Sequence, residues 1–287
     1  MAHVPVLLDE VLQYLQPKPG SRLIDATLGA GGHTREILDR VLPGGRVLAF
    51  DQDESAIRMA RESLESFGSS LEIVKSNFRH IAAVAAAQGW TEADGVLADI
   101  GVSSMMLDDA ERGFSFMRSG PLDMRMDREQ ELTAAEVVNK YNERNIADIL
   151  FQFGEERRSR PIARSIVRSR PLQTTADLVE AIRRVSGSPR YGQIHPATRT
   201  FQALRIYVND ELGSLEAFLD ASMALLKPGG RLAVITFHSL EDRIVKNRFR
   251  SPAAGKALTK KVVTASEDER SRNPRSRAAK LRVWQRA

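Results

Sequence analysis

The sequence predicts an α/β protein in which a doubly wound, parallel sheet carries an all-helical insert. Three observations support this fold class. Strand-like apolar runs alternate with helical patterns over residues 1–100, which is typical of a parallel sheet. From about Met105 onward, one helical pattern follows another without a strand. The α/β rhythm then returns at LKPGGRLAVITF, residues 226–237.

Four strands are expected in the first part of the chain, each a short apolar run between turn residues. They are RLIDAT (22–27), RVLAFD (46–51), LEIVKS (71–76) and GVLADIG (95–101). A helix is expected over residues 54–67, because its apolar residues share one helical face: Ile57, Ala60, Leu64 and Phe67. A fifth strand follows the Pro-Gly-Gly sequence at 228–230, where the preceding helix ends.

The region between the fourth and fifth strands predicts helices only. The sequence TAAE at 133–136 has the form of a capping box, which marks a helix start. Further helical patterns are NERNIADILFQF (142–153), PIARSIVRSR (161–170), TADLVEAIRRV (175–185) and PATRTFQALRIYVN (196–209). We therefore expect a sheet domain made of residues 1–106 and 211–287, with a helical insert at 107–210.

The composition excludes several kinds of protein and site. The chain has no cysteine, which removes disulfides and thiolate chemistry and suits a cytoplasmic protein. No apolar run approaches the length of a membrane span, and acidic residues interrupt the N-terminus too early for a signal peptide. The five histidines show no HxH or HExxH spacing, so no metal is expected. His238 and Glu241 fit a helix-surface pair better than a metal site.

Positive charge is concentrated in the middle and at the end of the chain. The net charge is +5, and residues 157–199 hold ten arginines against only Asp177 and Glu180. Arginine without lysine favours bidentate contact with phosphate, which indicates a polyanionic partner. A basic surface that only keeps the protein in solution is the alternative.

A glycine cluster follows the first predicted strand, in the stretch DATLGAGGHT, residues 25–34. Such a turn lets the backbone approach a ligand closely, with the N–H groups of a helix behind it. A dinucleotide fingerprint would place a third glycine where this chain has Thr34. The run instead looks like the first motif of S-adenosylmethionine-dependent methyltransferases. Asp51 ends the second strand, where an acid accepts the two ribose hydroxyls.

Several longer sequence motifs indicate a particular methyltransferase family. The chain resembles the bacterial 16S ribosomal RNA (cytosine N4)-methyltransferases of the MraW type. The matching strings are HVPVLLDEV (3–11), DATLGAGGHT (25–34), DIGVSSMMLDDAERGFSFMRSGPLDMRMD (99–127), FGEERRSRPIARSIV (153–167), HPATRTFQALRIYVNDEL (195–212), LKPGGRLAVITFHSLEDRIVK (226–246) and NPRSRAAKLRV (273–283). The resemblance implies a class I, Rossmann-like methyltransferase sheet with a substrate-recognising insert. It also implies methyl transfer from S-adenosylmethionine to N4 of a decoding-centre cytidine, on a small ribosomal subunit particle.

The resemblance also implies which residues contact the cofactor. They are Gly31, Gly32, His33, Asp51, Phe78 and Asp99, with Met106 as a seventh position. Met106 departs from the family pattern, which has a glutamine there. Because methionine has no amide group, a side-chain hydrogen bond at this position is in doubt.

The residues themselves favour chemistry at nitrogen. Methylation of cytosine at C5 generally needs attack by a cysteine thiolate, and this chain has none. An exocyclic amine needs instead an acceptor that holds one N–H and takes up the released proton. Asp99, at the end of a central strand, is the candidate catalytic residue. Cofactor binding alone is the alternative role for Asp99.

Several further residues are candidates for contact with the substrate. Phe114 and Phe116 could stack on an extruded base, and Arg118, Arg125 and Arg128 could reach phosphates. These aromatic side chains could equally fill the seam between the sheet domain and the insert. Four polar residues that flank apolar runs are candidates for the pocket or for helix caps: His195, Arg199, His238 and Ser239.

Two other functions remain open at this stage. One is a methyltransferase of the same fold that acts on DNA or a small molecule. The DNA amino-methyltransferase signature (D/N/S)PP(Y/F/W) is absent, because DIGV occupies the equivalent place. The other is a ribosome assembly factor without activity, against which the glycine cluster and Asp51 argue.

Overall fold

A computed structural model describes residues 5–187, 195–250 and 254–287. His3, in the first matching string, and Arg190, one of the ten arginines, lie outside the described residues. The chain divides into two compact units. Unit 1 comprises residues 1–101 and 212–287, and unit 2 comprises residues 102–211. The sequence predicts the corresponding boundaries after residues 106 and 210.

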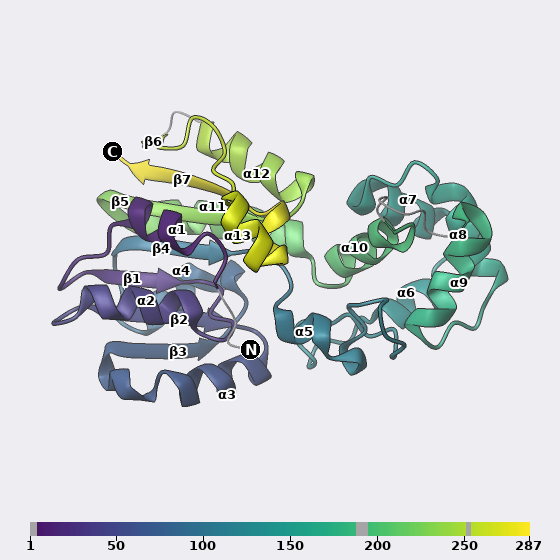
Figure 1. Ribbon diagram of the computed structural model, residues 1–287, viewed down its shortest axis with the longest axis horizontal. Coiled ribbons are helices and arrows are strands. Elements are labelled where there is room, and N and C mark those ends of the chain that lie inside the picture. Colours follow the sequence, from purple (N-terminus) through teal and green to yellow (C-terminus); the bar gives the residue numbers. More distant parts are fainter. Residues whose placement is uncertain (1–4, 188–194, 251–253) are drawn as a thin grey trace. The chain divides into compact units, whose positions relative to one another are not determined.

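Unit 1 is built on one seven-stranded sheet with the order β3-β2-β1-β4-β5-β7-β6 (Figure 1). The strands are β1 (Arg22–Asp25), β2 (Arg46–Asp51), β3 (Leu71–Lys75), β4 (Ala93–Asp99), β5 (Leu226–Thr236), β6 (Gly255–Ala257) and β7 (Lys280–Arg286). The first five pair in parallel, which confirms the predicted doubly wound sheet. The antiparallel pairs of β7 with β5 and with β6 are not predicted from the sequence.

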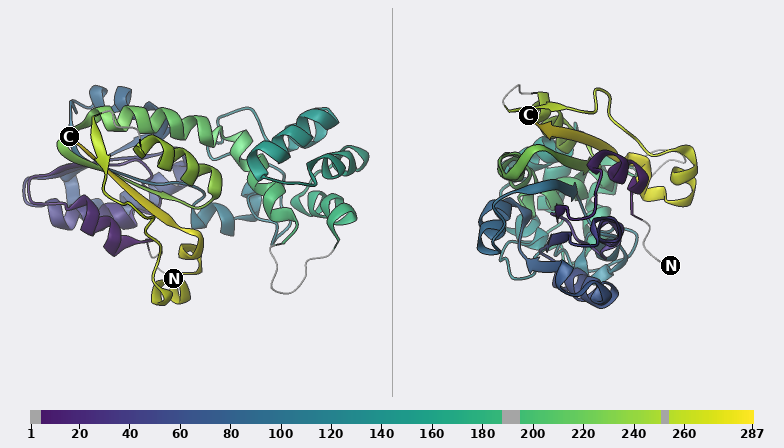
Figure 2. Two further views of the ribbon diagram at one scale, coloured as in Figure 1. Left: turned by 90° about the horizontal axis from the view of Figure 1, so that it is seen from above. Right: turned by 90° about the vertical axis from the view of Figure 1, so that its left-hand side faces the viewer.

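Helices cover both faces of this sheet (Figures 1 and 2). They are α1 (Leu8–Leu15), α2 (Gly32–Val41), α3 (Glu54–Ser63), α4 (Ile81–Ala87), α11 (Glu211–Leu225), α12 (Ser239–Arg250) and α13 (Glu267–Arg272). Alternate strand residues point to opposite faces. Ile24 thus packs in one core with residues of α4, α11 and α12, while the adjacent Leu23 packs in another with residues of α1 and α2.

The predicted helix over 54–67 is shorter in the structure. Helix α3 ends at Ser63 and is followed by a 3-10 segment, Glu65–Ser70. Leu64 stays fully buried at the junction, so its apolar position in the pattern reflects packing rather than continued helix. Gly68 takes a positive φ of 50°, which ends the helical geometry before β3.

Unit 2 is helical, as the sequence predicts. Its helices are α5 (Ser104–Asp108), α6 (Ala134–Lys140), α7 (Glu143–Gly154), α8 (Ser159–Arg168), α9 (Thr175–Ser186) and α10 (Ala197–Val208). They surround one apolar core that includes Val138, Leu150, Ile166 and Leu204. At the predicted capping box, Thr133 accepts the N–H of Glu136. The reciprocal capping box of the unit is at Thr174 and Asp177, at the start of α9.

In the part of the chain that the structure describes, no helix has both the length and the apolar character needed to span a bilayer.

Candidate functional site

Three neighbouring strands of the sheet each end in an aspartate. Asp51 ends β2, Asp25 ends β1 and Asp99 ends β4, and the parallel register places all three at the carboxyl edge of the sheet. Crevices at this edge are where ligands bind in open α/β sheets. The sequence analysis selects Asp51 and Asp99 and misses Asp25, which is buried at 1% exposure. Its position near the end of a predicted strand, next to the glycine cluster, is the signal that could have found it.

The glycine turn between β1 and α2 is held against this edge. The N–H of Gly29 donates to Oδ2 of Asp51 at 2.8 Å, so the turn and the end of β2 are joined directly. Gly31 has a φ of +83°, and a Cβ there would lie 2.7 Å from Leu64 Cδ1. A Cβ on Gly32 would lie 2.6 Å from Pro5 Cγ. The backbone conformation therefore favours glycine at 31, and the contact with Pro5 favours glycine at 32, in addition to any ligand.

Asp51 is half-buried, and each of its carboxylate oxygens accepts at least one backbone N–H. Oδ2 accepts from Gly29, and Oδ1 accepts from Asp53 at 2.8 Å. Burial raises the pKa of Asp51 to about 6, with the nearby charge of Asp53 adding to the rise. A carboxylate oxygen can accept more than one hydrogen bond, so both oxygens keep the capacity to accept a hydroxyl.

Phe78 comes three residues after the end of β3, the strand that pairs with β2. The N–H of Ser76 donates to the backbone oxygen of Asp51 at 2.9 Å. Asn77 then caps the short 3-10 turn Phe78–His80 by accepting the N–H of Arg79. The Phe78 ring packs edge-on against Phe218 of α11, with 5.2 Å between ring centroids. The Phe78 ring, for which an adenine contact is predicted, is therefore held in place by its packing against Phe218.

Asp99 is part of a buried polar group that also includes Asp25 and His33. Its backbone N–H donates to Thr27 Oγ1 at 2.6 Å, while Asp25 accepts the hydroxyl of Thr34 at 2.6 Å. Oδ1 of Asp99 is buried and receives no hydrogen bond from the described residues. Burial raises the pKa of Asp99 to about 8, and the charges of Asp25 and Glu241 add to the rise.

Asp25 is more enclosed than Asp99. Burial raises its pKa as well, although Thr34, His33 and Thr27 act in the opposite direction. The carboxyl edge therefore holds several acids whose charged form is disfavoured until a cation or donor comes near.

Two predicted substrate residues, His238 and Ser239, lie at the start of α12, just beyond β5. His238 Nε2 lies 2.9 Å from Oε1 of Glu241, and its Nδ1 accepts the N–H of Glu241 at 3.4 Å. Glu241 is fully buried and also accepts the N–H of Phe237 at 2.8 Å. The expected helix-surface pair of His238 and Glu241 is therefore wrong: the carboxylate lies inside the protein. Ser239 is exposed.

The remaining predicted residues belong to unit 2. Met106 and Phe114 are core residues there, 5% and 6% exposed. Phe116 stacks on the ring of His195 with 4.6 Å between centroids and meets Phe201 edge-on. Arg199 is exposed. Phe114 therefore packs inside the core of unit 2, and its ring presents little surface to a base. Phe116 and His195 form a partly exposed aromatic pair.

Arg125 is committed to its own loop. Its guanidinium donates twice to the Asp123 carboxylate, at 2.9 Å each, and also to the carbonyl oxygens of Arg128 and Gln130. Four of its five N–H donors are thus used within the loop. The predicted phosphate contact of Arg125 is therefore not supported, and the residue organises the turn before α6.

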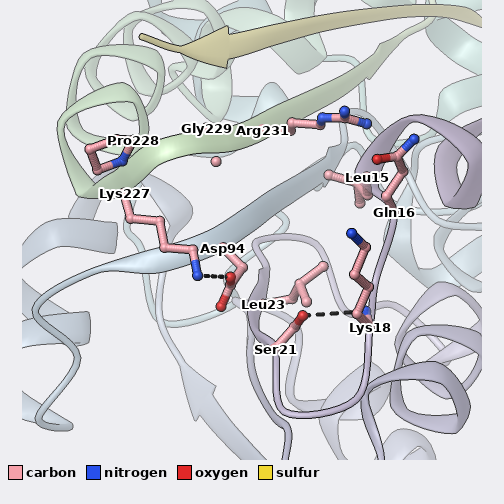
Figure 3. Close-up of a pocket in the computed structure, with 11 residues that line it drawn as sticks. Leu15, Gln16, Lys18, Ser21, Leu23, Asp94, Lys227, Pro228, Gly229 and Arg231 are labelled. Atoms are coloured by element: carbon pink, nitrogen blue, oxygen red, sulfur yellow. Dashed lines mark hydrogen bonds and ion pairs between the residues drawn. The ribbon is translucent and has the colours of Figure 1, made fainter.

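A cavity of about 270 Å³ lies at the opposite, amino edge of the sheet. Figure 3 shows Lys227 paired with Asp94 among the lining residues, which also include Lys18 and Arg231. None of the predicted cofactor or substrate residues lines this cavity. It is separate from the carboxyl-edge site and contributes nothing to it.

The sequence model of the MraW methylase family matches residues 1–287. The chain is 48% identical to the ribosomal RNA small subunit methyltransferase H of Dehalococcoides mccartyi, over 99% of this chain and 86% of that protein. Proteins of the same name from a Nostoc species and from Symbiobacterium thermophilum are 52% and 50% identical, over 98% of this chain and 92% and 95% of theirs. This chain therefore belongs to the MraW methylase family, and it is a methyltransferase that uses S-adenosylmethionine.

Proposed function

We propose that this protein transfers a methyl group from S-adenosylmethionine to the exocyclic N4 of a cytidine in the decoding centre of 16S ribosomal RNA, on a small-subunit particle. The observation that carries the choice of nitrogen is Asp99. Its Oδ1 is buried and receives no hydrogen bond from the described residues, in a chain that has no cysteine for attack at C6. The names of the relatives support small-subunit RNA as the substrate. Such a substrate implies action in the cytoplasm.

The residues at the carboxyl edge fit the cofactor. Both oxygens of Asp51 can accept a ribose hydroxyl beyond the backbone N–H groups that they already accept. Phe78 offers a ring near the end of β2 for the adenine. Asp25 is buried and Asp99 is half-buried, and a cationic ligand would stabilise both acids in their charged form. When bound, S-adenosylmethionine supplies an electrophilic methyl group on a positively charged sulfur.

The chain's own residues then act on the amine. The lone pair of cytosine N4 is delocalised into the ring, so the site must hold one N–H and let the nitrogen become pyramidal. We assign this task to the Asp99 carboxylate, which is fixed at its backbone by Thr27. The Asp99 carboxylate is partly shielded from solvent, and the lower local dielectric strengthens a hydrogen bond to the amine. His238 and Ser239, after β5, are assigned to the rim on which the base rests.

Unit 2 is assigned to recognition of the RNA. The partly exposed pair of Phe116 and His195 offers a face on which a base can stack. Arg199 lies four residues after His195 in the sequence. Its side chain is exposed and can reach a phosphate. Met106, buried in the core of this unit, is assigned a packing role in place of the amide contact of the family pattern.

The function is tested by methyl transfer in vitro. Unmodified small subunits and free 16S RNA are incubated with the protein and labelled S-adenosylmethionine, and the product nucleoside is identified by mass. N4-methylcytidine formed mainly on the particle is the expected result. A methylated carbon, or transfer to DNA, would refute the assignment of the substrate atom. Binding of cofactor and RNA without any transfer would indicate an assembly factor.

Replacing Asp51 tests the cofactor site. Asp51→Ala should weaken S-adenosylmethionine binding at least tenfold, because hydrogen bonds to a charged group contribute about 1.5–3 kcal/mol each. Because the pKa of Asp51 is raised to about 6, the affinity of the parent should also fall as the pH drops below that value. Calorimetry across pH 5–8 measures both effects. An unchanged dissociation constant in a folded Asp51→Ala variant would contradict the assignment.

A further inference from the structure

His33 is held with one ring nitrogen fixed by the backbone. It is the second residue of α2, its side chain is 7% exposed, and its Nε2 lies 3.0 Å from the carbonyl oxygen of Val6. A carbonyl oxygen can only accept a hydrogen bond, so Nε2 must carry a hydrogen. In the neutral imidazole the other nitrogen, Nδ1, is then without a proton and basic.

The carbonyl that sets this tautomer is itself firmly held. Val6 is 5% exposed, and the N–H of the next residue, Leu7, donates to the Glu269 carboxylate of α13 at 2.9 Å. The carbonyl oxygen of Leu7 accepts the N–H of Val11 and so begins α1. The chain around Val6 is therefore anchored on both sides, and the orientation of the His33 ring follows from it.

The basic nitrogen of His33 faces acids. Nδ1 lies 3.9 Å from Oδ2 of Asp99, close enough for a short movement to make a hydrogen bond. Asp25, at the end of β1, also interacts electrostatically with His33. Glu241 of α12, paired with His238, also acts electrostatically on Asp99. A proton placed on Nδ1 would thus be stabilised by a negatively charged surrounding.

We propose that Nδ1 of His33 is the final acceptor of the proton that the target amine releases, and that Asp99 passes this proton on. This inference rests on the proposed function. In the step, the bond from N4 to the methyl carbon forms while the bond from sulfur to that carbon breaks, and the sulfur keeps the electron pair. N4 then loses one proton to the Asp99 carboxylate. The proton moves to Nδ1, which leaves an imidazolium ion beside a restored carboxylate.

The tautomer can be measured without any substrate. In protein labelled with ¹⁵N-histidine, correlation of the ring protons with the ring nitrogens distinguishes a nitrogen that carries hydrogen from one that does not. At pH 8, His33 should show hydrogen on Nε2 and none on Nδ1, and at lower pH it should gain the second proton. Comparison with His33→Gln assigns the signal. Hydrogen on Nδ1 at pH 8 would overturn the inference.

The role in the reaction is tested by His33→Gln, which keeps an N–H able to reach the Val6 carbonyl and removes the titrating ring. Single-turnover methyl transfer is measured with saturating S-adenosylmethionine on small subunits, from pH 5 to pH 9. The parent rate should fall as the pH drops through the range in which histidine titrates. In His33→Gln the rate at pH 8 should be about tenfold to a hundredfold lower. Its pH profile should lose the part of the fall that His33 causes and keep the part that protonation of Asp99 causes.

Two controls separate the possible failures. His80→Gln removes an exposed histidine and should keep the pH profile of the parent. Circular dichroism and cofactor affinity show whether His33→Gln is folded and loaded. If the parent makes N4-methylcytidine and the cofactor-loaded His33→Gln variant has the same rate and pH profile, only the role of His33 is refuted and the proposed function stands. A parent that makes no N4-methylcytidine would refute the proposed function, and the inference with it.

Discussion

Asp99→Asn should lose methyl transfer by at least about a hundredfold, because an amide cannot take up the proton from the amine. The variant keeps the shape of the side chain and the hydrogen bond from its backbone N–H to Thr27. The rate is measured in single turnover at saturating S-adenosylmethionine, and the affinity for the cofactor is measured separately. If Asp99 served cofactor binding alone, the affinity would fall and the saturated rate would stay near that of the parent.

The same change should stabilise the fold. Burial raises the pKa of Asp99 to about 8, so its charged form is disfavoured in the folded protein. The native state therefore holds this proton more tightly than the unfolded chain, and the free energy of unfolding falls as the pH rises from about 4 to about 8. Asp99→Asn removes that loss, so its advantage over the parent in free energy of unfolding should be on the order of 4–5 kcal/mol near pH 8 and about 1–2 kcal/mol at pH 5. Thermal unfolding at both pH values measures it. If Asp99→Asn were less stable than the parent at pH 8, the charged form of Asp99 would not destabilise the folded protein.

Replacing Arg157, Arg158 and Arg160 by alanine should weaken RNA binding and leave S-adenosylmethionine affinity unchanged. All three side chains are exposed, and none is within ion-pair distance of a carboxylate among the described residues. They are thus available for phosphate, which argues against the alternative of internal pairing. Each lost phosphate contact should reduce the slope of log K against log salt by up to ~0.9 on double-stranded RNA, or ~0.7 on single strands. Filter binding over a salt series measures the slope.

The same unit offers a matched control with the same change of charge. Arg164 pairs with Glu143 at 3.3 Å, and Arg183 and Arg184 pair with Glu180 at 3.1 and 3.8 Å. Replacing these three by alanine should reduce RNA affinity and salt slope less, since they already contact carboxylates. Parallel salt slopes and equal affinities for the parent and the first triple variant would show that this part of unit 2 is not the RNA contact.

Much of the fold could be predicted from short stretches of sequence. The predicted strands at 22–27 and 46–51 correspond to β1 and β2. The helical patterns at 142–153 and 175–185 correspond to α7 and α9. Strand β7 was not predicted, although KLRVWQR alternates between more and less buried residues. Its place depends on pairing with β5, which lies more than forty residues earlier in the chain.

The candidate site was predicted in part. Asp51 and Asp99 stand at strand ends that the apolar pattern locates, and the glycine cluster marks the turn beside them. Asp25 and Glu241 were missed, because an acid in a sequence gives no sign that it is buried. Arg125 could not be distinguished from a phosphate ligand, since its partners, two of them carbonyl oxygens, are defined only by the folded loop.

By itself, the sequence determined the features that depend on neighbouring residues: where strands and helices form, where glycine permits a tight turn, and which chemistry is impossible without cysteine. The tertiary structure decided which polar groups are buried and what they meet. The His33 tautomer is set by Val6, whose neighbour Leu7 bonds to Glu269, 262 positions away in the chain. Desolvation and hydrogen bonding join residues that are distant in sequence, and they control the charge of a side chain. Local patterns cannot encode those contacts, so the protonation of the site is a property of the folded protein.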